Sequence, residues 1–408
     1  MNDYSIKGDS IDRNYRYALS ITSQFFFCGI PFRLDTTPKC SVNCSYCFAM
    51  SRGGRKTNMN LFANPEIIAR KFERVQNGFE GDVNSELIKL KMPIHFGGMS
   101  DPFSTNKSTA ISIKILEILS ELQYPIVLST KQTNVFENSN VQDILNKNKN
   151  LIIQISISSL DKKFLRKIEP NAPTPQHRLN AIKGLSSLGI PIIARIQPFF
   201  PWRTSEVQKE LIPALGENGV NHSIVEFIKL PVEESLFPAA DFSNEIGFDI
   251  KKYFLTNNAV NMSREWIFLT QHKWELLQPI IQAIRDNQMT YGAGDYGVNH
   301  LGDTDCCCGL DKFKGFDGYF KSFTSIIKKK NSDELFFSDV MKIDYPKKSL
   351  KMYLNSNCRI DGFNTIINLL RVKWNSPGSV NAPDTFLGIS YSGKRDEFND
   401  CIYLKGSI

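Results

Sequence analysis

Short apolar segments typical of β-strands alternate with helical patterns between residues 32 and about 230. Each apolar segment is rich in Ile and Val and is bounded by Pro, Gly, Ser or Asn, as strands usually are. Six such segments are predicted as strands, at 32–37, 93–98, 125–130, 151–158, 191–199 and 223–230. Repeated strand–helix units predict a parallel sheet with right-handed crossovers.

The segments between these strands repeat hydrophobic residues every three or four positions, which is the spacing of one helix face. In 108–122, for example, Ile111, Ile115 and Ile118 follow this spacing. Further helices are predicted at 64–79, 174–188 and, after the alternation is lost near residue 232, at 262–287. The Gly- and Asp-rich stretch 291–311 is expected to be an ordered loop.

These patterns predict an α/β fold, a partial (β/α)6 TIM-type barrel with a smaller C-terminal domain. We expect an N-terminal extension at 1–31, the barrel at 32–232, and the C-terminal domain, with a cysteine-bearing loop, at 233–408. In folds of this kind the catalytic residues lie at the C-terminal ends of the strands. The motifs described below fall at such ends.

Composition fits a soluble globular protein, because 41% of the 408 residues are hydrophobic and 22% are charged. The first 24 residues lack the apolar core of a secretory signal. No apolar run approaches the roughly 18 residues that span a membrane. We therefore expect a cytoplasmic protein with no membrane partner.

The nine cysteines are unevenly placed, and six of them fall in two tight groups. In a cytoplasmic chain such grouping favours metal binding or redox chemistry over disulfides. The groups are Cys40, Cys44 and Cys47, and Cys306, Cys307 and Cys308. Cys28 and Cys401 are most simply interpreted as small buried hydrophobic residues.

The first group, CSVNCSYC at 40–47, directly follows the first predicted strand. Three thiolates on one loop can bind three irons of a four-iron, four-sulfur (4Fe–4S) cluster and leave the fourth iron open. An open iron can bind S-adenosylmethionine (SAM) and deliver the electron that cleaves it to a 5′-deoxyadenosyl radical. The alternative is a structural zinc site, which usually needs four ligands. The loop resembles the signature of the radical SAM superfamily.

The residues predicted to bind SAM share a position on this loop or near the ends of the predicted strands. Glycine lets the SAM amino group approach the backbone, serine hydroxyls can bind the ribose, and the Lys131 ammonium can pair with the SAM carboxylate. Each of these residues could instead make only local structural contacts. The predicted set is Tyr46, Gly97, Gly98, Ser129, Lys131, Ser156 and Ser158.

Four longer segments resemble proteins related to spore photoproduct lyase, often labelled DNA repair photolyase-like. They are GGMSDPF (97–103), STKQTN (129–134), the stretch 156–192 and QPFFP (197–201). The resemblance covers residues 30 to about 205. It implies a partial (β/α)6 barrel, a SAM-bound cluster, a nucleic acid such as DNA as partner, and a reductant such as flavodoxin or ferredoxin.

One departure from that family bears on the reaction. Spore photoproduct lyase depends on a further cysteine inside the barrel as hydrogen donor, whereas this chain has no cysteine between Cys47 and Cys306. The departure argues against repair of thymine lesions. Two other features have structural interpretations: Glu169 and Arg178 are expected to form an ion pair, and Asp101 to cap the turn after the second strand. The position of Asp101 on the rim also makes it a candidate for contact with SAM or substrate.

The second cysteine group leaves three interpretations open. Cys306, Cys307 and Cys308, the candidate catalytic residues, could hold a second iron–sulfur cluster together with Cys358. They could instead donate hydrogen to a substrate radical, or serve structure only. In the first interpretation we expect the triplet to cover the open mouth of the barrel from the C-terminal domain.

Three functions are consistent with these features. The first is a radical SAM enzyme that modifies or repairs a nucleic acid or nucleotide, which a net charge of +7 permits but does not require. The second is a radical SAM peptide maturase with an auxiliary iron–sulfur cluster. The third is a non-catalytic iron–sulfur protein that binds nucleic acid and senses redox state.

Overall fold

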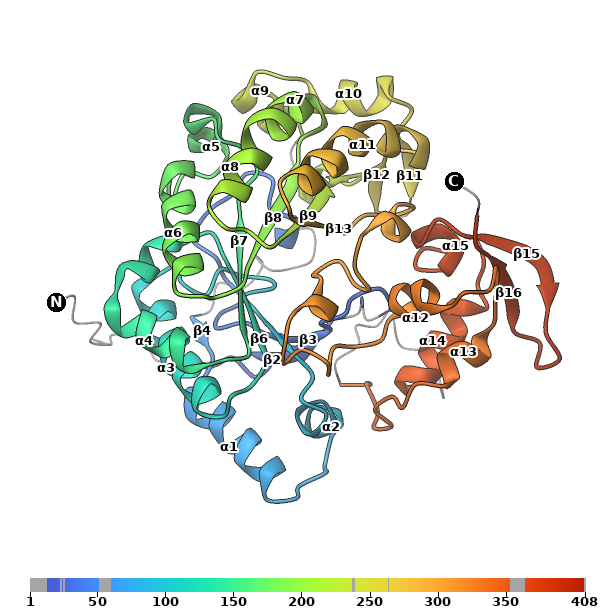
Figure 1. The fold of residues 1–408 in the computed structure, drawn as a ribbon, viewed down its shortest axis with the longest axis horizontal. Helices are drawn as coiled ribbons and strands as arrows, with labels where there is room; N and C mark the ends of the chain where they lie inside the picture. Colours follow the sequence, from blue (N-terminus) through green and yellow to red (C-terminus); the bar gives the residue numbers. More distant parts are fainter. Residues whose placement is uncertain are drawn as a thin grey trace.

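An eight-stranded sheet forms the centre of the structure, a computed structural model that describes residues 13–22, 24, 26–50, 60–236, 239–262, 264–352 and 364–406 (Figure 1). The strand order is β13-β9-β8-β7-β6-β5-β3-β2, in which β2 runs antiparallel to β3 and every other neighbouring pair is parallel. The strands are β2 (Leu19–Ile21), β3 (Phe32–Leu34), β5 (Ile94–Phe96), β6 (Ile126–Thr130), β7 (Leu151–Ser156), β8 (Ile192–Phe199), β9 (His222–Phe227) and β13 (Thr290–Ala293).

All six predicted strands are present, and from β3 onward the parallel strands follow one another in chain order. This winding is typical of TIM-type barrels. The sheet is nevertheless open among the described residues, where no strand pairing joins β13 to β2 or β3. The structure therefore shows a parallel α/β sheet with barrel-type winding, without a closed barrel.

The sheet extends further along the chain than the sequence pattern predicts. The seventh parallel strand, β13, lies in the stretch predicted as an ordered loop, and it pairs with β9. Its sequence, TYGA, is too short and too rich in small residues to show a strand pattern. Since β2 precedes residue 32 and β13 follows residue 232, the central sheet crosses both predicted domain boundaries.

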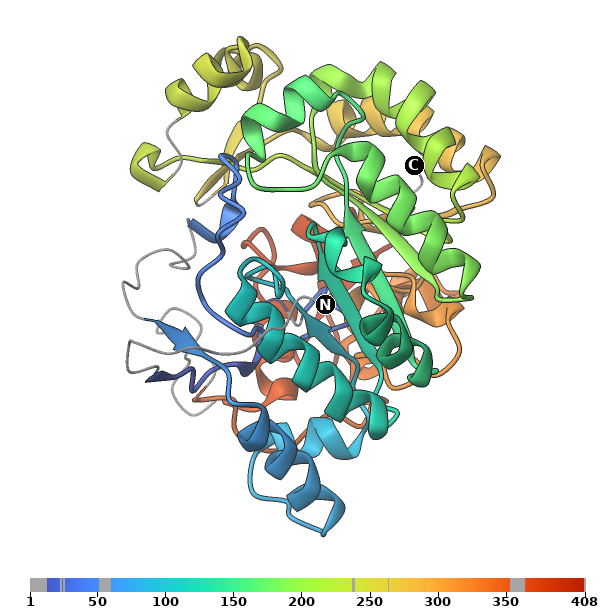
Figure 2. The ribbon, with the colours of Figure 1, turned by 90° about the vertical axis from the view of Figure 1, so that its left-hand side faces the viewer.

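Helices between the strands cover the outer face of the sheet (Figures 1 and 2). Their starts have ordinary caps: the Asn64 side chain accepts from the backbone N–H groups of Glu66 and Ile67, and Thr105 and Ser108 form a capping box. The connecting helices are α1 (Pro65–Gln76), α2 (Val83–Lys89), α3 (Asn106–Glu121), α4 (Ser139–Lys147), α5 (Lys162–Ile168), α6 (Pro175–Ser187), α7 (Thr204–Glu206), the π-helical turn Val207–Leu211 and α8 (Ile212–Glu217).

The chain between β9 and β13 differs from the predicted single helix at 262–287. Helix α11 begins only at Thr270 and ends at Asp286. The preceding residues form a small antiparallel sheet, because two short segments there pair with each other and with the chain after β9. The other elements of this region are β10 (Leu230–Pro231), α9 (Ala239–Ile246), α10 (Ile250–Thr256), β11 (Val260–Met262) and β12 (Glu265–Ile267).

The C-terminal elements pack around Trp374, which is buried and donates its indole N–H to the carbonyl of Cys401 at 2.6 Å. They contact the barrel through aromatic residues of the N-terminal segment: the rings of Phe27 and Phe386 stack with centroids 3.5 Å apart. The elements are α12 (Phe323–Lys329), α13 (Phe337–Met341), α14 (Ile366–Trp374), α15 (Pro383–Phe386) and a sheet of β14 (Glu334–Leu335), β15 (Ser390–Arg395) and β16 (Cys401–Leu404). One buried core includes residues of both parts.

Side chains on the inner face of the sheet form layers, because alternate residues of a strand point to opposite faces. The layer near the strand starts is apolar and packs against the loop 306–319. It consists of Val127, Ile152, Ile193 and Ile224. Two residues further along the strands the inner layer is polar, and beyond it lies the rim that carries the first cysteine loop.

Candidate active site

A cavity of about 880 Å³, open mouth included, lies at the C-terminal ends of the strands. It brings together nine of the ten residues predicted to hold the cluster or SAM. These are Cys40, Cys44, Cys47, Tyr46, Gly97, Gly98, Ser129, Lys131 and Ser156. Ser158 is different: it is fully buried beyond the end of β7 and does not line this cavity.

The first cysteine loop is attached to its surroundings by backbone contacts. Ser45 donates its backbone N–H to the carbonyl of Ile168 at 3.0 Å, and the Asn171 side chain donates to the carbonyl of Ser41 at 2.9 Å. Burial raises the pKa of Cys40 to about 11 and that of Cys44 to about 12. Metal ligation at this loop would therefore release thiol protons.

The donor set of the loop fits an iron–sulfur cluster. Within the described residues, no three His, Cys, Asp or Glu side chains stand close enough to enclose a single metal ion. In a 4Fe–4S cluster each thiolate binds a different iron, so the sulfur atoms need not converge on one point. Three soft thiolates on one loop, facing a cavity, are the ligands that such a cluster takes.

Glu169 connects the cysteine loop to the rest of the rim. Its carboxylate accepts hydrogen bonds from the Tyr46 hydroxyl and from the Arg178 guanidinium, and the Lys131 ammonium lies 3.8 Å away. The predicted ion pair of Glu169 with Arg178 is confirmed, and both side chains are buried. Burial alone would raise the pKa of Glu169, but the charges of Arg178 and then Lys131 outweigh it and hold that pKa below its usual value.

Gly97 and Asp101 shape the turn after β5. Gly97 has a φ of +89°, and a Cβ on it would lie 2.4 Å from the carbonyl oxygen of Ser129. Asp101 accepts hydrogen bonds from the Thr130 hydroxyl at 2.9 Å and from the backbone N–H of Lys131 at 2.7 Å, besides capping its own turn at Phe103. The predicted cap is therefore present, and it also joins the ends of β5 and β6.

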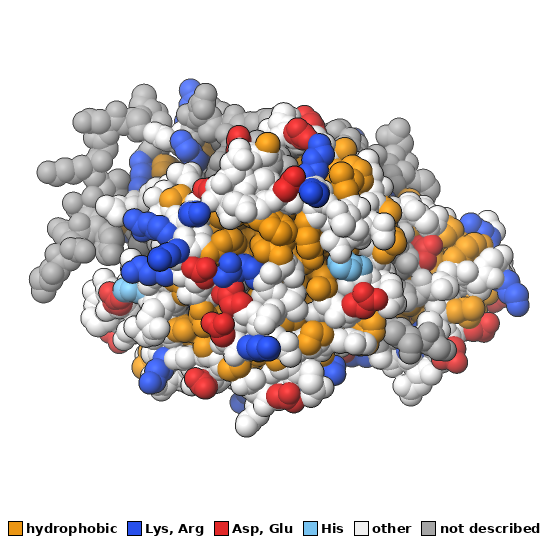
Figure 3. All heavy atoms as spheres, turned by 90° about the horizontal axis from the view of Figure 1, so that it is seen from above, with side chains coloured by type: hydrophobic (Ala, Val, Ile, Leu, Met, Phe, Trp, Pro, Cys, Tyr) orange, Lys and Arg blue, Asp and Glu red, His pale blue; other side chains and the backbone are white. Residues whose placement is uncertain are grey.

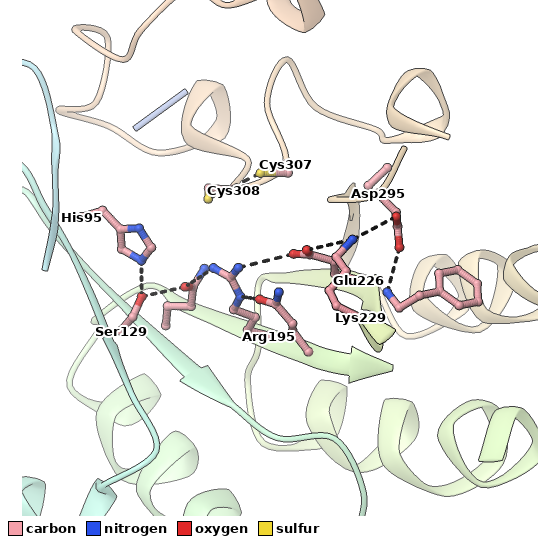
Figure 4. A network of polar contacts seen from close by, with 12 residues as sticks. His95, Ser129, Arg195, Glu226, Lys229, Asp295, Cys307 and Cys308 are labelled. Carbon is pink, nitrogen blue, oxygen red and sulfur yellow. Dashed lines mark hydrogen bonds and ion pairs between the residues drawn. The ribbon is translucent and has the colours of Figure 1, made fainter. Parts of the chain in front are cut away.

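A polar network forms the floor of the cavity, and the sequence analysis did not identify it (Figure 4). The Ser129 hydroxyl donates to Gln154 at 2.6 Å and lies 2.7 Å from Nε2 of His95. Burial, reinforced by Arg195 and then Arg33, lowers the pKa of His95, so its ring is neutral. The predicted SAM-binding hydroxyl of Ser129 is thus already engaged inside the sheet.

The network continues as a chain of ion pairs across the inner face (Figure 4). Glu226 lies 3.4 Å from both Arg195 and Lys229, and Asp295 lies 3.3 Å from Lys229 and 3.1 Å from Lys273. Burial would raise the pKa of Asp295, but the two lysines, Lys229 first, hold it well below its usual value. Of these residues, Arg195 and Lys229 line the cavity.

The second cysteine group lies elsewhere than predicted. Cys306 and Cys308 are buried against the apolar layer at the strand starts, at the other end of the inner face from the first cysteine loop. The triplet therefore does not cover the mouth of the barrel, because the chain after β13 turns back inside the sheet. Cys358, the predicted fourth ligand, lies outside the described residues.

No helix in the described part of the chain combines the length and apolarity needed to cross a membrane.

Comparison with known proteins shows relationships of different extent. No protein-family model matches the chain. An uncharacterised protein, ORF301 of the Acidianus two-tailed virus, is 37% identical over 60 residues, which are 14% of this chain and only 20% of that protein. SuiB of Streptococcus suis, solved with bound S-adenosylmethionine, superimposes at a TM-score of 0.37 and 16% identity over 57% of this chain and 48% of that one.

The structural likeness to spore photoproduct lyase is more extensive. Its structure with bound AdoMet and a dinucleoside spore photoproduct superimposes at a TM-score of 0.50 and 12% identity, over 67% of this chain and 78% of that chain. A second structure, complexed with the dinucleoside spore photoproduct, gives the same TM-score and coverage at 13% identity. Across two thirds of its length, the chain therefore shares the fold of spore photoproduct lyase, a radical SAM enzyme. This shared fold confirms the resemblance that the sequence predicted.

Proposed function

We propose that the protein is a radical SAM enzyme that acts on a nucleic acid or nucleotide. One observation carries the proposal: three cysteines of one loop and six predicted SAM-binding residues, from four separate rim segments, line a single cavity. The shared fold with spore photoproduct lyase supports it. Cys40, Cys44 and Cys47 would hold a 4Fe–4S cluster, which when bound supplies the electron that cleaves SAM to methionine and a 5′-deoxyadenosyl radical.

The chain itself positions SAM. The half-buried Lys131 supplies a positive charge for the SAM carboxylate, and Glu169 holds that ammonium beside the Tyr46 ring, whose centroid lies 5.7 Å away. The backbone at Gly98 is open to a ligand, because that residue lines the cavity without a side chain. The Ser156 hydroxyl is available for the ribose at the end of β7.

Positive charge at the cavity floor supports an anionic substrate. Arg195 and Lys229 line the cavity. Both pair with Glu226, and Lys229 also shares Asp295 with Lys273, so three cationic side chains face two carboxylates. A phosphodiester is the anion that a nucleic acid would present to them. The outer surface gives weaker support for an anionic substrate than the cavity does. On the face in Figure 3, Lys and Arg side chains gather on one side, but acidic side chains lie among them.

SAM binding and substrate class can be tested on anaerobically reconstituted protein. The proposal predicts about four irons at the first loop. It also predicts an electron paramagnetic resonance signal of the reduced cluster that changes when SAM is added. Retention of single-stranded DNA should weaken steeply with salt, as phosphate contacts do. A spectrum that stays the same when SAM is added would contradict the proposal that the protein is a radical SAM enzyme. Retention of DNA that does not depend on salt would contradict the proposed nucleic-acid substrate.

A further inference from the structure

Four thiols from distant parts of the chain gather on the inner side of the sheet. Cys28 precedes β3, whereas Cys306, Cys307 and Cys308 follow β13, and all four belong to one cluster of packed residues. The two segments touch directly: a Cβ added at Gly29 would lie 2.8 Å from the Cβ of Cys306. Cys28 is therefore part of the second cysteine group, although the sequence suggested an isolated buried residue.

Three of these thiols face one cavity. Cys28, Cys307 and Cys308 line a space of about 810 Å³, open mouth included, whose walls also include Arg33 on β3 and Gly294 directly after β13. The cavity thus lies where the parallel sheet stays open. Cys306 does not line it, because its sulfur is turned towards Gly29.

The spacing of two thiols suits ligation of one ion. The Sγ atoms of Cys307 and Cys308 are 3.9 Å apart (Figure 4). Two thiolates bound to a tetrahedral ion through bonds of roughly 2.3 Å stand about 3.8 Å from each other. A third bond requires the Cys28 side chain to rotate towards the pair, because the three thiols do not yet enclose one point. Cysteine has one rotatable side-chain bond, with three staggered positions.

Positive charge favours thiolates in this cavity. Arg33, Arg195 and Lys229 line it together with the thiols, and so do the carboxylates of Glu226 and Glu265. Three cationic and two anionic side chains leave the lining with a formal charge of +1. Three thiolates on a divalent ion carry one excess negative charge, which these cations can neutralise.

We propose that Cys28, Cys307 and Cys308 form a second metal-binding site, for a thiophilic metal centre held separately from the first cysteine loop. The chemistry common to a single zinc or iron ion and to an iron–sulfur cluster is ligation by soft thiolates. A metal bound here would join the segment before β3 to the loop after β13 across the open side of the sheet. The proposal does not depend on SAM chemistry at the other site.

Metal analysis of complementary variants tests the proposal. In the full-length chain, replacing Cys40, Cys44 and Cys47 by Ala removes the first site and should leave one metal centre, either about one zinc or an iron–sulfur cluster with matching sulfide. With Co²⁺ as probe, the same variant should show thiolate-to-cobalt charge-transfer absorption. Replacing Cys28, Cys307 and Cys308 by Ser in that first-loop variant should abolish both signals. The same three replacements in the otherwise unchanged chain should keep the iron of the first loop.

Two controls separate ligation from damage to the fold. Cys401→Ser removes a buried thiol that does not line the cavity and should leave metal content unchanged. Zn²⁺ should raise the thermal midpoint of the first-loop variant but not of the variant that lacks both cysteine sets, since a ligand that binds only the folded state stabilises it. A folded first-loop variant without metal or cobalt absorption, or with a Cys307–Cys308 disulfide in its place, would overturn the proposal.

Discussion

At the scale of single residues, Gly97 does more than leave room for a cofactor. Its positive φ is one that L-residues adopt at a cost of roughly 1–2 kcal/mol. In addition, a methyl group would meet the Ser129 carbonyl oxygen at 2.4 Å. The glycine is therefore required by the junction of β5 and β6, whether or not SAM is bound.

Gly97→Ala should consequently destabilise the protein by more than the backbone term alone. Gly78 is a matched control, because its φ is +88° and nothing lies within 4 Å of its added Cβ. We expect urea unfolding to show a loss of about 1 kcal/mol for Gly78→Ala and a clearly larger loss for Gly97→Ala. Equal losses would show that the turn relaxes freely and that Gly97 is not constrained by the sheet.

Lys131 offers a residue-scale test of SAM binding. Lys131→Ala should weaken SAM affinity by about 1.5–3 kcal/mol, the range for hydrogen bonds to charged groups, while iron content stays at the wild-type level. Lys163→Ala changes an exposed residue of α5, removes the same charge outside the cavity and should leave affinity unchanged. Equilibrium titration of the reconstituted protein measures both. Unchanged SAM affinity in Lys131→Ala would mean that Lys131 does not bind SAM and only contacts Glu169.

The polar network beneath the cavity has a signal in the sequence. Strands buried on both faces of a parallel sheet usually read as continuous apolar runs. Here His95, Gln154, Arg195 and Glu226 interrupt such runs at inward-facing positions. The interruptions mark the strands that line a cavity. Their partners Asp295 and Lys273 could not be predicted, because the pairing depends on how the chain after β9 folds back.

At the scale of secondary-structure elements, strong patterns were predicted well and short ones were not. The strands β3, β5, β6, β7, β8 and β9 were all found near their predicted positions because each is a bounded apolar run. Strand β13 has four residues and gains its place from the ladder with β9. The start of α11 was placed too early, because the preceding β11 and β12 are too short to interrupt a helical pattern.

Glu169 joins two elements, the cysteine loop and α6, and its ionisation should contribute to stability. Its pKa is lowered in the folded state, so the contribution is complete above the unfolded value and is lost as pH falls through the folded value. The difference in unfolding free energy between wild type and Glu169→Gln should therefore shrink when urea unfolding is repeated at pH 7, 5 and 3.5. A difference that is constant with pH would mean that folding leaves the pKa of Glu169 unchanged, which would contradict the lowered value.

At the scale of the whole molecule, the barrel and the C-terminal elements share one core. Phe26 and Phe27, which precede the barrel, pack against Phe323 and Phe386 of the C-terminal part. Removing either part would expose large apolar surfaces on the other. The division into separate units that the sequence suggested is thus not reflected in separate cores.

A shared core predicts cooperative unfolding. Trp374→Ala removes a fully buried side chain and should cost about 3–5 kcal/mol. Calorimetry should show one transition in the wild type and one transition at lower temperature in the variant. Phe398→Ala changes an exposed residue of the same C-terminal part and should shift the transition temperature only slightly. Two separate transitions, only one of them shifted by Trp374→Ala, would contradict the shared core.

The site could be predicted from sequence to the extent that its residues are local. Cys40, Cys44 and Cys47 are recognised by spacing, and Gly97 and Lys131 by their place at strand ends. The long-range parts were out of reach, because no sequence pattern brings Cys28 to Cys307 or sends the triplet inside the sheet. Tertiary packing decides those positions, and only the folded structure displays them.

The central claim is tested most directly by anaerobic SAM cleavage under a strong reductant, with 5′-deoxyadenosine and methionine as products. Reconstituted wild-type protein and Cys401→Ser should both form the two products in equal amounts. The variant with Cys40, Cys44 and Cys47 all replaced by Ala should form neither, because its loop cannot hold the cluster. Undiminished cleavage in that triple variant, or none in a fully reconstituted wild type, would contradict the claim that this cavity is a radical SAM site.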